Sequence, residues 1–195
     1  MKKLCFLILL FQASLSLSQE KAQEFQNNLN KEFATREDSP LTEEDFKVFK
    51  GLSFYPITEK FIVQAQFVRT PNEKVFKMKT TSSRLPEYVK YGELHFVIDD
   101  KNFTLNIYQN IDLIKKEGYE DYLFLPFSDT TCGKESYIGG RYIDMRIPKS
   151  DTVIIDFNKA YNPYCAYNHK YSCPIVPLEN DLPIEILAGV KKFHD

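Results

Sequence analysis

The amino-acid sequence predicts a mainly β domain, either an antiparallel β-barrel-like fold or a β-sandwich, with two short N-terminal helices packed on it. Apolar residues recur at helical spacing only before about residue 50, and beyond it they alternate with polar residues over about eight short segments. The links between these segments are too short for helical crossovers, so neighbouring strands should run antiparallel. A barrel or a sandwich follows, because a flat open sheet would expose its edges.

Residues 1–18 resemble a secretory signal peptide. Two lysines open the segment, an apolar run covers residues 4–11, and the small-residue pattern Ser-Leu-Ser closes it at residues 16–18. The run is shorter than the roughly 20 apolar residues that a membrane span needs. We therefore expect export to the periplasm or the extracellular space, with Gln19 as the first residue of the exported protein and no membrane span left.

Residues 19–195 are expected to form a single globular domain, because this length suits one domain with its own hydrophobic core. The formal net charge of −2 becomes more negative once the two lysines of the signal peptide are removed, so the composition does not favour nucleic acid as a partner. The sequence specifies neither a cofactor nor an oligomeric state.

Two helices are expected before the strands. Residues 20–34 place four apolar side chains at helical spacing among charged and polar ones, so that one stripe of this helix is apolar. Thr42 and Asp45 resemble a capping box, and a short second helix should follow and end at Gly51. The apolar stripe of the first helix consists of Ala22, Phe25, Leu29 and Phe33.

Alternation of apolar and polar residues then predicts three hairpins, each formed by strands that are neighbours in the sequence. They cover residues 61–81, 94–108 and 143–157. Two further strands are expected near residues 122–127 and 184–188.

Residues 156–180 should form a long ordered loop. Their first part, DFNKAYNPYCAYNHKYSCP, is dense in aromatic residues and contains prolines, which cannot join a strand ladder. Long loops inside compact domains are commonly functional. We therefore expect a lid across one end of the barrel, which closes the core or walls a pocket.

Several segments, in this order and spacing, are similar to one known family. They include LFLPFSDTTCGKESY at 123–137, GGRYID at 139–144, DFNKAYNPYCAY at 156–167 and CPIVPLEN at 173–180. The chain resembles the bacterial and archaeal family catalogued as domain of unknown function 1684, over nearly its whole length after residue 18. Cys132 and Val190 depart from the pattern, which suggests a small residue and a glutamate there. The resemblance implies no activity, because the family has none assigned.

Arg141 is the main candidate for ligand binding. Arginine is scarce, with five residues against twenty lysines, and Arg141 directly follows Gly139-Gly140 at the entry to a strand. Glycines allow close approach of a ligand, and a guanidinium can hold a carboxylate or phosphate by two parallel hydrogen bonds. We expect a small anionic ligand at Arg141, with Tyr142 in the same site. The alternative is an internal ion pair with Glu135, Asp156 or Glu179.

These three carboxylates suggest two further sites. Glu135, Asp156 and Glu179 could converge as the acid and base of a hydrolase, or bind a hard cation together with Asn158 and Asn180. They lie on separate loops, so their spacing does not enforce either arrangement.

Cys165 and Cys173 are predicted to form a disulfide in an oxidising compartment, which leaves Cys132 as a thiol without an assigned role. One alternative is a pair of buried free thiols. The other is a zinc site that adds His169, but no fourth ligand is evident, so no metal is predicted.

Three functions fit these patterns. The first is an exported small-ligand-binding β-domain with a pocket between loops 129–141 and 156–180. The others are a hydrolase-type enzyme that uses the candidate carboxylates, and an envelope module that binds another protein. A mostly apolar cavity would favour the binder. A polar, enclosed cavity with two carboxylates within reach of one water would favour the enzyme. A flat aromatic patch would favour the interaction module.

Overall fold

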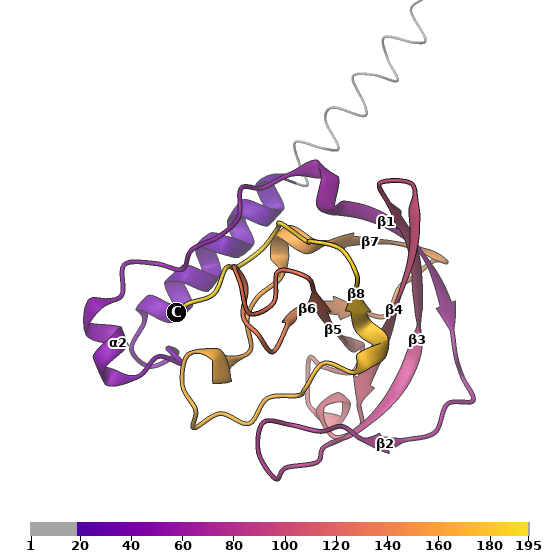
Figure 1. Ribbon diagram of the computed structural model, residues 1–195. Helices are drawn as coiled ribbons and strands as arrows, with labels where there is room; N and C mark the ends of the chain where they lie inside the picture. The colour runs from indigo at the N-terminus through magenta and orange to yellow at the C-terminus, as the bar shows by residue number, and fades with distance from the viewer. Residues whose placement is uncertain (1–18, 195) are drawn as a thin grey trace, which may run out of the picture.

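Eight strands form one curled sheet, a half-barrel, in the computed structural model, which describes residues 19–194 (Figure 1). The order along the sheet is β6-β5-β4-β3-β1-β7, with β2 added to β3 and β8 added to β5. This confirms the mainly β, antiparallel, barrel-like fold; the predicted signal peptide lies outside the described residues. The strands are β1 (Ile62–Arg69), β2 (Phe76–Lys77), β3 (Glu87–Ile98), β4 (Lys101–Asn110), β5 (Tyr122–Asp129), β6 (Arg141–Arg146), β7 (Thr152–Asp156) and β8 (Asp181–Leu182).

Two helices precede the sheet, as the sequence predicts, although the first is long. Residues 19–34 are helical, and the apolar stripe of this helix is buried or half-buried. The second helix, α2 (Glu43–Val48), begins after Thr42, whose hydroxyl accepts a hydrogen bond from the Asp45 amide at 3.1 Å. No described helix is long and apolar enough to cross a membrane.

The hairpin predicted over residues 94–108 is confirmed as β3 and β4. Ile98 pairs with Lys101, so the turn consists of Asp99 and Asp100 alone. Both have positive φ, 49° and 58°. A two-residue turn with both central residues in the left-handed region matches the twist of the strands that it joins.

The hairpin predicted over residues 61–81 is wrong, because β1 and β2 do not pair with each other. Both pair with β3: Ala65–Arg69 of β1 lies along Gly92–Phe96, and β2 lies along Glu87 and Tyr88. The two strands therefore follow one edge of β3 end to end. Alternation located both strands, but a strand as long as β3, with 12 residues, offers room for two partners on one edge.

The hairpin predicted over residues 143–157 is also wrong. β6 pairs with β5 and β7 pairs with β1, at opposite ends of the strand order. The link between them, residues 147–151, spans at most about 17 Å, so the sheet must curl to bring its two ends within reach. The last strand, β8, lies before the predicted 184–188 segment, and it pairs with β5 in parallel.

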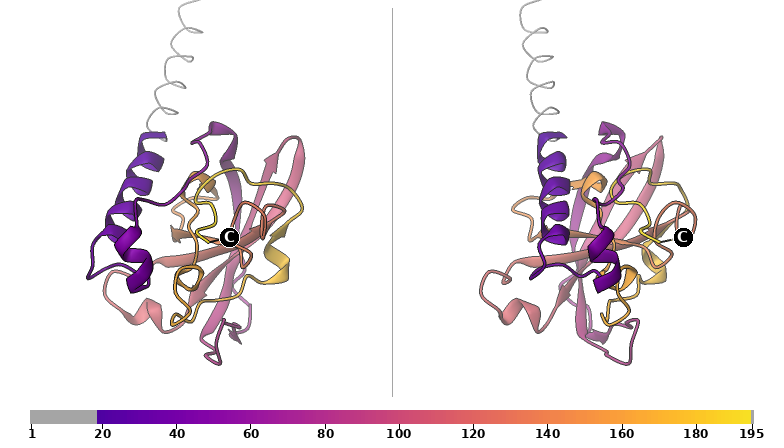
Figure 2. Two further views of the ribbon diagram at one scale, coloured as in Figure 1. Left: turned by 60° about the vertical axis from the view of Figure 1, so that its left-hand side comes forward. Right: turned by 90° about the vertical axis from the view of Figure 1, so that its left-hand side faces the viewer.

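The two faces of the sheet carry different side chains. The inner face holds the main hydrophobic core, which the 3₁₀ helix η3 (Phe157–Lys159) and the C-terminal segment help to close. The outer face of β4, β5 and β6 carries an aromatic cluster that includes Tyr108, Phe124 and Tyr142. Figures 1 and 2 show the 19–34 helix beside the sheet, with the segment after β7 between them.

Replacing Asp100 by glycine is expected to raise the free energy of unfolding by about 0.5–1 kcal/mol, because glycine adopts positive φ without steric cost. Asp112→Gly is the matched control, since Asp112 is also exposed but has a φ of −90°. Glycine there increases the freedom of the unfolded chain and removes an exposed ion pair with Lys115, so it should destabilise. Urea unfolding followed by circular dichroism measures both variants. Equal destabilisation of the two would contradict the left-handed turn.

Candidate functional site

Arg141, the main candidate for binding an anion, is buried and serves the core. It is 0% exposed. Its Nη2 donates hydrogen bonds to Asp129 Oδ2 at 2.5 Å and to the Ile186 carbonyl at 2.9 Å, and its Nη1 donates to the Ala188 carbonyl. The guanidinium therefore ties the end of β5, the start of β6 and the C-terminal segment together.

This placement favours the internal ion pair over the anion anchor and identifies an unexpected partner. The acid is Asp129, whose side chain is also 0% exposed, and not one of the three candidate carboxylates. An anion could reach the guanidinium only by displacing Asp129 from the core. At Gly140, φ is +81° and a Cβ would stand 2.6 Å from the Phe127 carbonyl oxygen. The glycine therefore permits close packing of β6 against β5 and does not make room for a ligand.

The structure does not assemble the three candidate carboxylates into a metal site. Glu135 and Glu179 are exposed. Asp156 is buried at the end of β7, where its Oδ1 accepts hydrogen bonds from the backbone and side-chain amides of Asn158, at 3.1 and 2.9 Å. Burial raises the pKa of Asp156. Within residues 19–194, no group of three or more His, Cys, Asp or Glu side chains could hold a metal ion.

Asn158 and Asn180, predicted as ligands, instead fix the long loop to the rest of the fold. Both are 0% exposed. Asn158 Nδ2 donates to the Thr58 carbonyl and its Oδ1 accepts from the Thr58 amide, both at 3.0 Å. Asn180 pairs in the same way with the Asn106 backbone, at 2.8 Å in each direction. Side-chain amides thus satisfy backbone groups where the loop has no strand to pair with.

Cys165 and Cys173 lie together as two buried thiols, and the predicted disulfide is not formed in this structure. The Cys165 amide donates to Cys173 Sγ at 3.2 Å. A hydrogen bond with the Cys173 thiol lowers the pKa of Cys165 to about 6. His169, the third ligand of the zinc alternative, is exposed, and the described chain groups no three metal ligands there. Cys132 lies apart, in the β5–β6 loop.

A pocket of about 480 Å³, lined mainly by aromatic side chains, lies on the outer face of the sheet. We name it the aromatic pocket. Its walls come from the 19–34 helix, from β3, β5 and β6, from the connection between β4 and β5, and from the loop after β7. No described residue of the 129–141 loop lines it, so it does not lie where the sequence analysis expected a pocket. Its rings include Tyr122 and Phe124 of β5, Tyr142 of β6, and Tyr161 and Tyr164 of the loop.

Antiparallel pairing of β5 and β6 builds the floor of the aromatic pocket. Phe124 pairs with Asp144, and residues spaced by two along a strand share a face, so Tyr122 and Tyr142 lie on the same face as this pair. The ring of Tyr142 meets that of Phe124 edge-on, with centroids 4.7 Å apart, and that of Tyr161 at 5.9 Å. These contacts join the loop to the floor.

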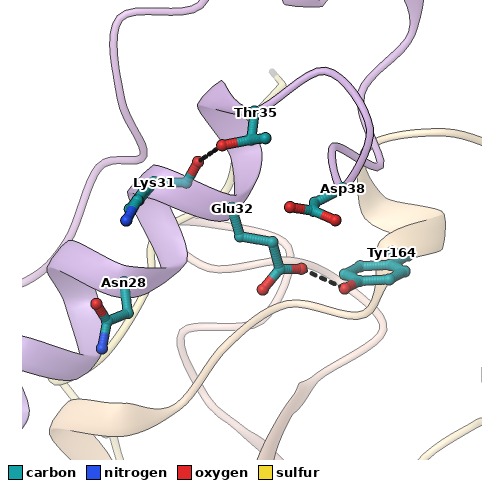
Figure 3. A pocket seen from close by; sticks show the side chains of 6 residues that line it. All are labelled: Asn28, Lys31, Glu32, Thr35, Asp38 and Tyr164. Carbon is teal, nitrogen blue, oxygen red and sulfur yellow. Dashed lines mark hydrogen bonds between the residues drawn. The ribbon is translucent and has the colours of Figure 1, made fainter.

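Two carboxylates in the aromatic pocket accept hydrogen bonds from tyrosine hydroxyls. Asp144 Oδ1 accepts from Tyr122 and from Tyr161, both at 2.6 Å. Glu32, on the 19–34 helix, accepts from Tyr164 (Figure 3). Figure 3 views this bond from an adjoining pocket, which is lined mostly by polar residues of the helix and of the turn that follows it, and which shares Glu32 and Tyr164 with the aromatic pocket.

The charge of the aromatic pocket comes from these carboxylates. Burial first, and then the nearby Asp144 carboxylate, raise the pKa of Tyr122 and Tyr161 above the ordinary value. Burial also raises the pKa of Tyr164, with a contribution from Glu32. The phenols therefore stay neutral at physiological pH and act as donors. Glu32 and Asp144 are acidic, and no lysine, arginine or histidine is among the described residues that line the pocket.

Of the predicted binding residues, only Tyr142 lines the aromatic pocket. It cannot share a site with Arg141, because successive residues of a strand point to opposite faces. Arg141 enters the core and Tyr142 enters the pocket. The sequence did contain a signal for the floor of the pocket. Asp144 alternates with the apolar residues of its predicted strand, so it belongs on the face opposite the core, together with Tyr122 and Phe124 of the neighbouring strand. The sequence did not reveal which segments cover this face.

Comparisons with known proteins identify a family and a fold. The model of the family described as protein of unknown function (DUF1684) matches residues 47–191. An uncharacterised protein of Haloarcula marismortui, solved by solution NMR, is similar to this chain at 28% identity, with a TM-score of 0.69. The match covers 88% of this chain and 92% of that protein. No curated protein is significantly similar.

Arg141→Lys is expected to lower the free energy of unfolding by about 3 kcal/mol and the melting temperature by roughly 6–12 °C. Lysine keeps the charge but cannot hold Asp129 and two carbonyls with one planar fork. Arg146→Lys is the control on the same strand, because Arg146 pairs with Asp121 at 2.7 Å while 55% exposed, so this exchange should leave the melting temperature nearly unchanged. Scanning calorimetry measures both. An unchanged melting temperature for Arg141→Lys would contradict the structural role.

Proposed function

We propose that this chain, which belongs to the DUF1684 family of proteins of unknown function, is an exported small-ligand-binding β-domain that holds its ligand in the aromatic pocket. The observation that carries the proposal is a hollow of about 480 Å³ walled by aromatic rings, with only a few polar groups among them. Ligand sites in proteins have this size and this composition, in which apolar walls supply area and a few polar groups fix orientation.

The character of the aromatic pocket supports a binder over the two alternatives. A hydrolase would need an acid and a base that face one bound substrate, whereas Glu135, Asp156 and Glu179 do not line this pocket. Its own carboxylates, Glu32 and Asp144, come from different walls and already accept tyrosine hydrogen bonds. An interaction module would present its rings on a flat surface, but here they line a hollow.

Export and a disulfide belong to the same proposal. The pattern of residues 1–18 supports a signal peptide. Delivery to an oxidising compartment would allow Cys165 and Cys173 to bridge, and their closeness in the loop supports this. Because Cys173 also lines the aromatic pocket, the bridge would pin the wall of the ligand site.

Leu113→Trp is expected to remove the bound ligand, because Leu113 lines the aromatic pocket and an indole would fill it. The control is Leu178→Trp, the same exchange at a side chain that is 91% exposed. Native mass spectrometry of each protein, isolated from its own host and again after incubation with host extract, reports any bound mass. Wild type and Leu178→Trp should carry a ligand that Leu113→Trp lacks. No bound mass in wild type, or equal occupancy in all three, contradicts the proposal.

Oxidation is expected to join Cys165 to Cys173 and to leave Cys132 reduced. Closing the loop of residues 165–173 should stabilise the fold by about 2.5 kcal/mol, because the bridge restricts the unfolded chain. Peptide mapping under non-reducing conditions identifies the bridge in exported protein. The melting temperature should fall on addition of dithiothreitol in wild type and in Cys132→Ser, but not in Cys173→Ser. A bridge that involves Cys132, or three free thiols in exported protein, refutes the assignment.

A further inference from the structure

We infer that the ligand of the aromatic pocket is a small organic cation, whose ammonium group sits against the tyrosine rings and faces Asp144. The inference rests on the proposed function and specifies its ligand. It also replaces the anionic ligand that the sequence suggested through Arg141, because that guanidinium lies in the core and not in the pocket.

The charge of the lining residues gives the first argument. Glu32 and Asp144 carry negative charge, and no basic side chain is among the described residues of the lining. An anion placed there would meet two carboxylates without a partner. A cation would gain from both, although Asp144 is exposed and water screens part of its attraction.

The geometry of Asp144 gives the second argument. Both tyrosine hydroxyls, from Tyr122 and Tyr161, donate to the same oxygen, Oδ1. The other oxygen, Oδ2, receives no hydrogen bond from any residue that the structure describes, so it stays available to a ligand. The two bonds also hold the carboxylate in one orientation before a ligand arrives, which reduces the entropy lost on binding. The carboxylate is thus prepared for a positive group.

The aromatic rings give the third argument. The face of a tyrosine ring carries negative electrostatic potential and attracts a cation within about 6 Å of the ring centroid, and quaternary ammonium groups are bound in aromatic cages in this way. Tyr88, Phe124, Tyr142 and Tyr161 form a continuous series of ring contacts along the pocket, with centroids 4.7 to 5.9 Å apart. Several rings can therefore contact one ligand.

Three basic side chains of the described chain contact residues of the lining without lining the pocket themselves. Arg84 donates to the Ser172 carbonyl at 2.7 Å, Lys170 lies over the Tyr171 ring, and Arg146 lies beside two tyrosines. The guanidinium of Arg146 lies 6.0 Å from the ring centroids of Tyr119 and Tyr122, both of which line the aromatic pocket. Arg146 itself does not line the pocket and is paired with Asp121 at 2.7 Å. The hydrogen bond with Asp121, and then the charges of Asp121 and Asp144, raise the pKa of Arg146. Its charge is thus shared between two carboxylates, and Glu32 and Asp144 together keep the lining acidic. The contact of Arg146 also places a cation beside these rings in the protein itself.

Three probes of similar shape and different charge test the inference. They are choline, its neutral analogue 3,3-dimethylbutan-1-ol, and the anion 3,3-dimethylbutanoate, each titrated to millimolar concentration into the ¹⁵N-labelled protein. Ethanolamine, added as a fourth probe, distinguishes a methylated from a primary ammonium group. We expect choline or ethanolamine to shift amide signals around the aromatic pocket, with a dissociation constant at least about tenfold lower than that of the neutral probe. The anion should cause no shift.

Two sets of variants assign the effect to named groups. Asp144→Asn should weaken cation binding by about tenfold and leave the neutral probe unchanged, whereas Asp112→Asn, an exposed carboxylate outside the aromatic pocket, should change neither. Tyr122→Leu should weaken cation binding more than Tyr122→Phe, because only phenylalanine keeps the ring face. Folding of each variant is checked by its amide spectrum.

The outcomes separate the two proposals. Equal binding of the cationic, neutral and anionic probes in the aromatic pocket would overturn the cation inference and leave the ligand-binding function standing. Cation binding that Asp144→Asn does not weaken would also overturn it, because the carboxylate would then have no part in recognition. No shift in the pocket with any probe would also overturn the inference. The ligand-binding function would still stand in that case if native mass spectrometry finds a host-derived ligand on wild type that Leu113→Trp lacks.

Discussion

The buried ion pair between Arg141 and Asp129 is the interaction on which the arrangement of this fold depends. Both side chains are 0% exposed, and the guanidinium also holds carbonyls of the C-terminal segment. Removing two charges from water is costly, and the hydrogen bonds of both Nη atoms offset much of this cost, while the buried Nε has no hydrogen-bond partner among the described residues. The pair therefore fixes the start of β6 and the C-terminal segment against β5, and any displacement of one strand leaves an unpaired charge in the core.

The position of this pair has a consequence for the ligand site. β6 presents Arg141 to the core and Tyr142 and Asp144 to the outer face, because side chains alternate along a strand. The same strand is thus held rigidly from the inside while it forms the floor of the aromatic pocket outside. A site built on a strand that the core fixes keeps its geometry better than a site on a free loop.

The long loop after β7 has the same double role. Asn158 and Asn180 bond to backbone groups of the fold and replace the ladder that the prolines prevent. Phe157 packs into the core, while Tyr161 and Tyr164 reach the aromatic pocket. The two asparagines are polar and lie in a loop, which suggested that they bind a ligand. Here they fix the loop to the fold, and the aromatic residues of the loop form a wall of the pocket.

The sequence by itself determined much of the local structure: the strand segments other than β8, the Thr42 cap of α2, a turn that begins at Asp99, and which residues of a strand share a face. These follow from periodicity and from turn chemistry, which depend on near neighbours. Only the tertiary structure decided the partners. It placed β1 beside β3 and β7, paired Arg141 with Asp129, and brought a helix, three strands and two connecting segments around one pocket. Such contacts join distant segments, and alternation gives a side chain its face but not the residue that it meets there.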